Sequence, residues 1–169
     1  MTRAARVALA LLLSVFTACA FTPLRLPPSP SLHLSELADE GDPIRQASLE
    51  LVLDGLAADE MGELRRAQGL YARALQVDSG NPYAYLALAR HHVAGGDSDR
   101  ALEHLARARD LLDAYEEMSP RVEVHLVGLR GAALRLEGRT AEAEPLLARA
   151  ADVAPTVWRD GTLDASELR

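Results

Sequence analysis

The chain contains no lysine and only one cysteine, Cys19, among its 169 residues. A single cysteine excludes an intramolecular disulfide, so the fold must depend on packing. The absence of lysine also excludes the phosphate-binding loop that ends in Lys followed by Ser or Thr. Aromatic residues make up only 4% of the chain, while Ala, Leu, Glu and Arg dominate it. This composition favours helices over sheets.

Positive charge is scarce relative to negative charge. The chain has 18 basic residues against 25 acidic ones, which gives a formal net charge of −7. An acidic protein repels phosphate backbones, and the sequence shows no basic patch that would offset this repulsion. We therefore expect no nucleic-acid partner.

The recognisable catalytic motifs are also missing. The sequence has no G-x-S-x-G elbow, no H-E-x-x-H and no C-x-x-C. His91 and His92 are adjacent, so on a helix they point about 100° apart, and zinc needs three or four convergent ligands. We read both histidines as structural or solvent-facing, and Asp97 or Asp99 as a helix cap. We expect no catalytic residue, no cofactor and no metal.

The first residues read as a targeting segment. Arg3 and Arg6 precede an apolar run over residues 7–16, which is too short to span a bilayer comfortably. Val-Phe-Thr-Ala-Cys at residues 15–19 resembles a bacterial lipobox. This resemblance implies that residues 1–18 are removed and that Cys19 carries a lipid. Ordinary cleavage before Phe21, an uncleaved anchor over 7–24, or a buried structural cysteine are the alternatives.

A tether follows the cysteine. Residues 19–31 include four prolines, which favour an extended spacer over a helix. Residues 32–47 are expected to lead into the domain with a short capping helix. Asp42-Pro43 looks like a helix start, with Asp as the cap and Pro in the first turn.

The rest of the chain repeats. A set of three small residues and one large side chain recurs after 34 residues and again after a further 42. The three sets are Gly62, Ala67, Tyr71, Ala74; Gly96, Ala101, Leu105, Ala108; and Gly138, Ala143, Leu147, Ala150. Apolar residues lie three and four positions apart within each set, as in amphipathic helices. Stacked hairpins of this kind bury a core that one hairpin alone cannot.

This pattern resembles the tetratricopeptide repeat. The resemblance implies an all-α fold, a short right-handed superhelix of about three helical hairpins at residues 48–81, 82–115 and 124–157. An insertion at 116–123 and a tail or cap at 158–169 complete the chain. In the family, the matching positions pack the two helices together: Gly55, Ala67, Tyr71, Ala74, Ala89, Ala101, Leu105, Ala108, Gly131, Ala143, Leu147 and Ala150.

The family also binds partners in a concave groove lined by the first helix of each repeat. The matching positions here are Leu49, Val52, Leu56, Tyr83, Leu86, Arg90, His125 and Arg135. A largely apolar groove with two arginines suits a peptide with apolar anchors and acidic character. Two alternatives remain: the apolar members belong to the core between repeats, and each arginine forms an ion pair within the chain.

The sequence therefore predicts a lipid-anchored interaction scaffold or assembly adaptor in the bacterial envelope, on the periplasmic face of the outer membrane. Its expected partner is a protein or peptide, and it meets the membrane through the lipid. One alternative is a structural protein that forms homo-oligomers without a separate client. A second is a periplasmic protein released by ordinary signal peptidase.

Overall fold

A computed structural model describes residues 32–37 and 42–169. Within these ranges every regular element is a helix, as the composition predicted. None of the helices in the described ranges is both long enough and apolar enough to cross a membrane. The predicted signal segment, Cys19 and the Pro-rich tether lie outside the described residues.

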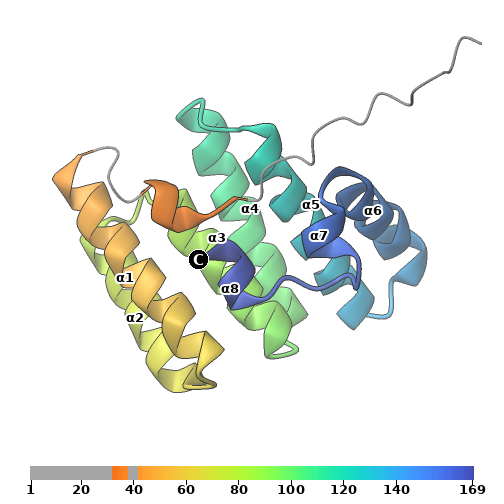
Figure 1. Cartoon of the computed structure of the whole chain (residues 1–169), viewed down its shortest axis with the longest axis horizontal. Helices are drawn as coiled ribbons and strands as arrows, with labels where there is room; N and C mark the ends of the chain where they lie inside the picture. Colours follow the sequence, from red (N-terminus) through yellow and green to blue (C-terminus); the bar gives the residue numbers. More distant parts are fainter. Residues whose placement is uncertain (1–31, 38–41) are drawn as a thin grey trace, which may run out of the picture.

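Six helices form three antiparallel hairpins that stack side by side (Figure 1). The helices are α1 (Pro43–Glu60), α2 (Leu64–Val77), α3 (Pro82–Ala94), α4 (Ser98–Ala114), α5 (Pro120–Leu136) and α6 (Thr140–Val153). Each helix packs most extensively on its hairpin partner, α1 on α2, α3 on α4 and α5 on α6. The stack continues because α3 also packs against α1 and α5. This is the predicted all-α hairpin fold.

Local sequence sets where the helices begin. Asp42, Asn81 and Ser119 are the N-caps of α1, α3 and α5, and each is followed by proline in the first turn. The side chain of each cap accepts a hydrogen bond from a free backbone N–H, as N-caps do. Asp97 caps α4 in the same way, so the capping interpretation of this residue is confirmed.

The turn inside each hairpin depends on one glycine. Gly62, Gly96 and Gly138 have φ angles of 74°, 78° and 76°, in the left-handed region that glycine alone adopts at little cost. All three belong to the set of residues that recurs along the sequence.

Small residues let the two helices of a hairpin approach closely. A Cβ atom added at Gly55 would lie 2.4 Å from Cε1 of Tyr71, and one added at Gly131 would lie 2.9 Å from Cγ of Leu147. The structure buries all twelve residues that the sequence assigned to repeat packing. The large side chain of the second helix therefore fills the space that the small residue of the first helix leaves open.

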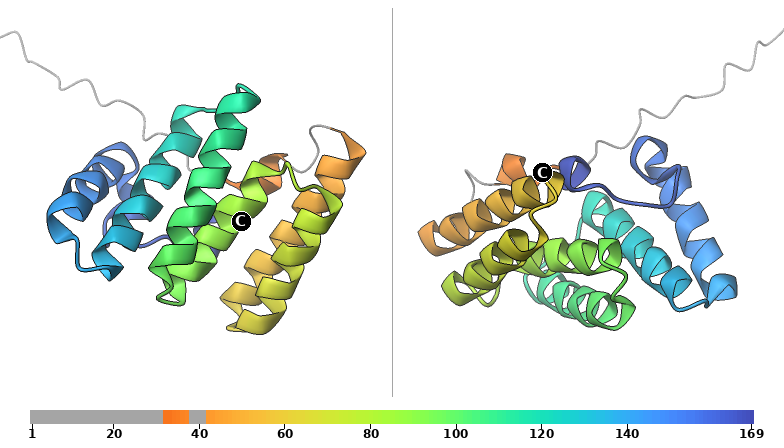
Figure 2. Two further views of the ribbon diagram at one scale, coloured as in Figure 1. Left: turned by 180° about the vertical axis from the view of Figure 1, so that it is seen from behind. Right: turned by 90° about the horizontal axis from the view of Figure 1, so that it is seen from below.

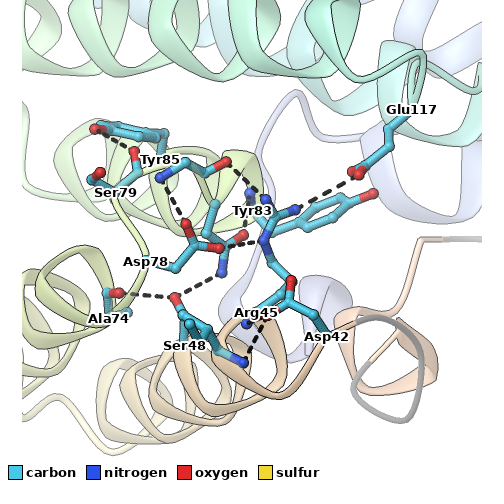
Figure 3. A network of polar contacts seen from close by, with 12 residues as sticks. Asp42, Arg45, Ser48, Ala74, Asp78, Ser79, Tyr83, Tyr85 and Glu117 are labelled. Atoms are coloured by element: carbon cyan, nitrogen blue, oxygen red, sulfur yellow. Dashed lines mark hydrogen bonds and ion pairs between the residues drawn. The ribbon is translucent and has the colours of Figure 1, made fainter.

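A polar network joins the first hairpin to the second (Figure 3). Ser48 of α1 donates a hydrogen bond to the carbonyl oxygen of Ala74 (2.8 Å) and accepts one from Nδ2 of Asn81 (2.9 Å). Arg45 is paired with Asp78 and donates to the carbonyl oxygen of Gly80 (3.1 Å). The α2–α3 turn is thereby held against α1, and buried polar groups there have partners.

The expected insertion at 116–123 does not form a separate loop. Helix α4 continues to Ala114, and α5 already begins at Pro120, before the expected start of the third unit at 124. A short connection remains, in which Glu116 has a φ angle of 57°. The extra residues therefore lengthen α4 and α5 more than they lengthen the connection.

Residues 155–169, the C-terminal segment, turn back across the stack. This segment contains two short helices, α7 (Pro155–Trp158) and α8 (Ala165–Leu168), and α8 packs against α1 at the opposite end of the array (Figures 1 and 2). The 3-10 helix η2 (Leu34–Leu37) lies beside it, and the backbone N–H of Ser35 donates to the carbonyl oxygen of Arg169 (3.1 Å). The segment thus covers the face lined by α1, α3 and α5, called the inner face below.

Candidate functional site

The predicted groove residues lie on the inner face, but the chain itself covers them. Seven of the eight are buried and one, Arg135, is exposed. The buried ones are Leu49, Val52 and Leu56 of α1, Tyr83, Leu86 and Arg90 of α3, and His125 of α5. In this structure the apolar members belong to the core, which is the alternative that the sequence left open.

Trp158 is the largest side chain that the C-terminal segment buries against the inner face. Its side chain is 1% exposed and lies against Gly128 of α5, where an added Cβ would come within 2.4 Å of the indole ring. The indole Nε1 donates a hydrogen bond to Nδ1 of His125 (3.2 Å). The missing side chain at Gly128 makes room for the indole, as close approach at a glycine does. Trp158 was not among the site residues predicted from the sequence, although the chain has no other tryptophan.

His125 must be neutral to accept this bond. Because Nδ1 accepts from the indole, the ring proton is on Nε2, which has no hydrogen-bond partner among the described residues. Burial, together with the smaller effects of the nearby charges of His33 and Arg121, lowers the pKa of His125 to about 4. The side chain therefore stays uncharged at neutral pH.

Two more contacts hold the segment, one near its middle and one at its C-terminal end. Nη2 of Arg135 donates to the carbonyl oxygen of Gly161 (2.8 Å), and Arg169 forms an ion pair with Glu60 at the end of α1 (3.1 Å). Leu163 and Leu168 are buried between these contacts. The segment therefore uses apolar anchors and a carbonyl held by an arginine, the type of contact expected of a groove-bound peptide.

Arg90 does not reach into an open groove. Its guanidinium is paired with the carboxylate of Asp59, and their side chains are 7% and 1% exposed. The same carboxylate accepts from the hydroxyl of Tyr71 (2.9 Å) and contacts Nδ1 of His91 (2.8 Å). The hypothesis that Arg90 is available to a partner's carboxylate is wrong for this structure, because α1 already supplies one.

The charges in this cluster support one another. Burial raises the pKa of Asp59, but the hydrogen bond from His91 and the charge of Arg90 outweigh this effect and leave the pKa below its ordinary value. Burial and the neighbouring carboxylate raise the pKa of Tyr71. Asp59 thus remains ionised, and the cluster ties α1 to α2 and α3.

The adjacent histidines contribute to packing. His92 is 7% exposed and stacks on His104 of α4 with ring centroids 5.2 Å apart, while His91 lies edge-on to Tyr71 at 5.8 Å. Burial lowers the pKa of both His92 and His104. No group of three or more potential metal-ligating side chains occurs within the described residues.

A cleft of about 300 Å³ opens between α4 and α5 and is not lined by the C-terminal segment. Its floor is formed by four leucines: Leu102, Leu105, Leu126 and Leu134. Three arginines surround it: Arg109 of α4, Arg130 of α5 and Arg139 in the following turn. We call this site the α4–α5 cleft, and it was not among the sites predicted from the sequence.

These observations define a helical-hairpin repeat protein with a covered inner face. Residues 60–118, which run from the end of α1 to the α4–α5 connection, match the tetratricopeptide repeat family. This part of the chain therefore carries tetratricopeptide repeat sequence, as its spacing indicated. No curated protein and no solved structure matches the chain.

Proposed function

We propose that the protein is a lipid-anchored interaction scaffold of the bacterial envelope and not an enzyme. The stack of three hairpins is the observation that carries the scaffold role, because repeats of this family present extended surfaces that generally bind other proteins. The polar groups on the inner face also support the scaffold role, because their contacts join the helices to one another or the C-terminal segment to the helices.

The envelope location rests on the N-terminal sequence. A basic start, an apolar run over 7–16 and Cys19 directly after small residues are together typical of a bacterial lipoprotein signal. Residues 19–31 would then separate the helical domain from the membrane surface. We place the domain on the periplasmic face of the outer membrane.

Anchoring is tested with Cys19→Ser. Wild-type protein should incorporate labelled palmitate and sediment with membranes, whereas the variant should do neither. Ser14→Ala, in the apolar run, is the control and should behave as wild type. A variant that remains membrane-bound, or an unlabelled wild-type protein that begins at Phe21, would overturn the lipoprotein proposal and leave the repeat fold unaffected.

The scaffold role is tested by chemical crosslinking in intact cells. We expect an antibody against the protein to recover it bonded to a distinct protein, and light scattering on the purified full chain to give a monomer mass. A stable dimer recovered only with itself would favour the self-associating alternative. Cells that lack the protein provide the control for antibody specificity.

A further inference from the structure

The α4–α5 cleft has the shape of a site for a short helix. Leu102, Leu105 and Arg109 lie along one side of α4, and Leu126, Arg130 and Leu134 lie along one side of α5, at spacings of three to four residues. Each series spans about two helical turns, or roughly 10–12 Å at 1.5 Å per residue. A cleft of this length takes two or three anchor side chains from an amphipathic helix.

The charges around the cleft indicate the chemistry of that helix. Arg139 is held by Glu137 (3.0 Å) and Glu142 (2.9 Å), so its charge is largely satisfied within the chain. Arg109 and Arg130 form no hydrogen bond and no ion pair with any residue in the described ranges, although Arg130 lies close enough to Glu142 for its charge to help lower the pKa of that carboxyl.

Unpaired guanidinium groups are unexpected beside an apolar floor in a chain of net charge −7. The carboxylate that also lines the cleft, Asp110, is exposed. Arginine pairs with carboxylates through two parallel hydrogen bonds, and such pairs strengthen where water is excluded. The α4–α5 cleft therefore complements a ligand with acidic groups on both sides of apolar ones.

We propose that the α4–α5 cleft docks an amphipathic helix of a protein partner that carries acidic residues beside leucine-like anchors. This proposal rests on the proposed scaffold function and names the surface it uses. The inner face is filled by Trp158 and the rest of the C-terminal segment, whereas no residue of that segment lines the cleft.

The test is a fluorescence anisotropy titration of the full chain, purified in mild detergent, against two labelled peptides of about 14 residues, long enough for four turns. One peptide has Leu on one face and Glu on the other, and its twin has Lys in place of Glu. We expect the Glu peptide to bind with a Kd below about 1 mM and to bind more weakly at high salt. The Lys peptide should not bind.

Variants locate the binding. The double variant Arg109→Glu, Arg130→Glu should raise the Kd for the Glu peptide tenfold or more. The control, Arg65→Glu with Arg73→Glu, makes the same charge change at exposed positions of α2 and should change the Kd less than threefold. Ala106→Phe fills the cleft from an exposed position without changing charge and should also weaken binding tenfold. Ala72→Phe on α2 is its control.

The proposal is overturned if the two peptides bind equally, if neither binds, or if the cleft variants bind as wild type. Its failure is distinguishable from failure of the scaffold role. If the Arg109→Glu, Arg130→Glu protein crosslinks to the same partners in cells as wild type does, the scaffold function stands and the cleft is not the docking site. A wild-type protein that captures no partner would refute the scaffold function, whatever the peptides do.

Discussion

Acid should release the C-terminal segment from the inner face through His125. At neutral pH the imidazole accepts the indole hydrogen bond of Trp158, and burial holds its pKa at about 4. Once the ring is doubly protonated, Nδ1 becomes a donor and faces another donor, so the bond to Trp158 is lost. A released segment exposes His125 to water, where its pKa returns to about 6.5.

The size of the effect follows from these two pKa values. Above pH 6.5 the ring is neutral in both the closed and the open state, so it adds no pH dependence. As the pH falls from 6.5 to 4 the open state binds the proton first, and closure weakens by about 1.4 kcal/mol per pH unit, or about 3 kcal/mol in all. Below the folded pKa of about 4 both states are protonated and the loss levels off.

Trp158 reports this change directly, because it is the sole tryptophan of the chain. We expect its emission to shift to longer wavelength between pH 7 and pH 4.5, while circular dichroism at 222 nm retains most of the helical signal. The lowered pKa values of His92 and His104 destabilise the fold in the same pH range, so the helical signal must be followed in parallel.

His125→Asn is the matched variant. The amide oxygen of asparagine lies near the position of Nδ1 and accepts a hydrogen bond, but the side chain does not titrate. The variant should lose the acid-dependent shift of Trp158 emission, although the cavity left by the smaller side chain lowers its stability at all pH values. An unchanged emission in wild type, or an equal pH dependence in the variant, refutes the reasoning.

Two further substitutions test the contacts between helices. Gly55→Ala should lower the unfolding free energy by about 1–3 kcal/mol in urea titrations, because the new methyl group meets Tyr71. The control is Gly69→Ala, where nothing lies within 4 Å, and it should be neutral or stabilising. Equal results for both variants would contradict the close-contact assignment. Asp59→Ala should lower the unfolding free energy by about 3–5 kcal/mol, because it leaves the buried guanidinium of Arg90 without its counter-charge. A melting temperature within about 1 °C of wild type would show that this pair does not stabilise the stack.

The sequence alone determined the hairpin pattern. Gly62, Gly96 and Gly138 mark turns that need a left-handed backbone, and small residues such as Gly55 and Ala89 mark places where two helices touch. These requirements are local, or they repeat at a fixed spacing, so they are visible in one chain without its structure. The caps at Asp42 and Asp97 were predictable for the same reason, since a cap acts on the next few residues.

Only the tertiary structure decided what the faces of the stack do. Nothing in the spacing of Arg90 shows that Asp59 of the preceding hairpin lies beside it, and nothing in residues 155–169 shows that Trp158 turns back onto Gly128. The α4–α5 cleft likewise depends on how two helices are offset. Such contacts join residues far apart in the chain, and each depends on the positions of several elements at once, which periodicity within one helix does not specify.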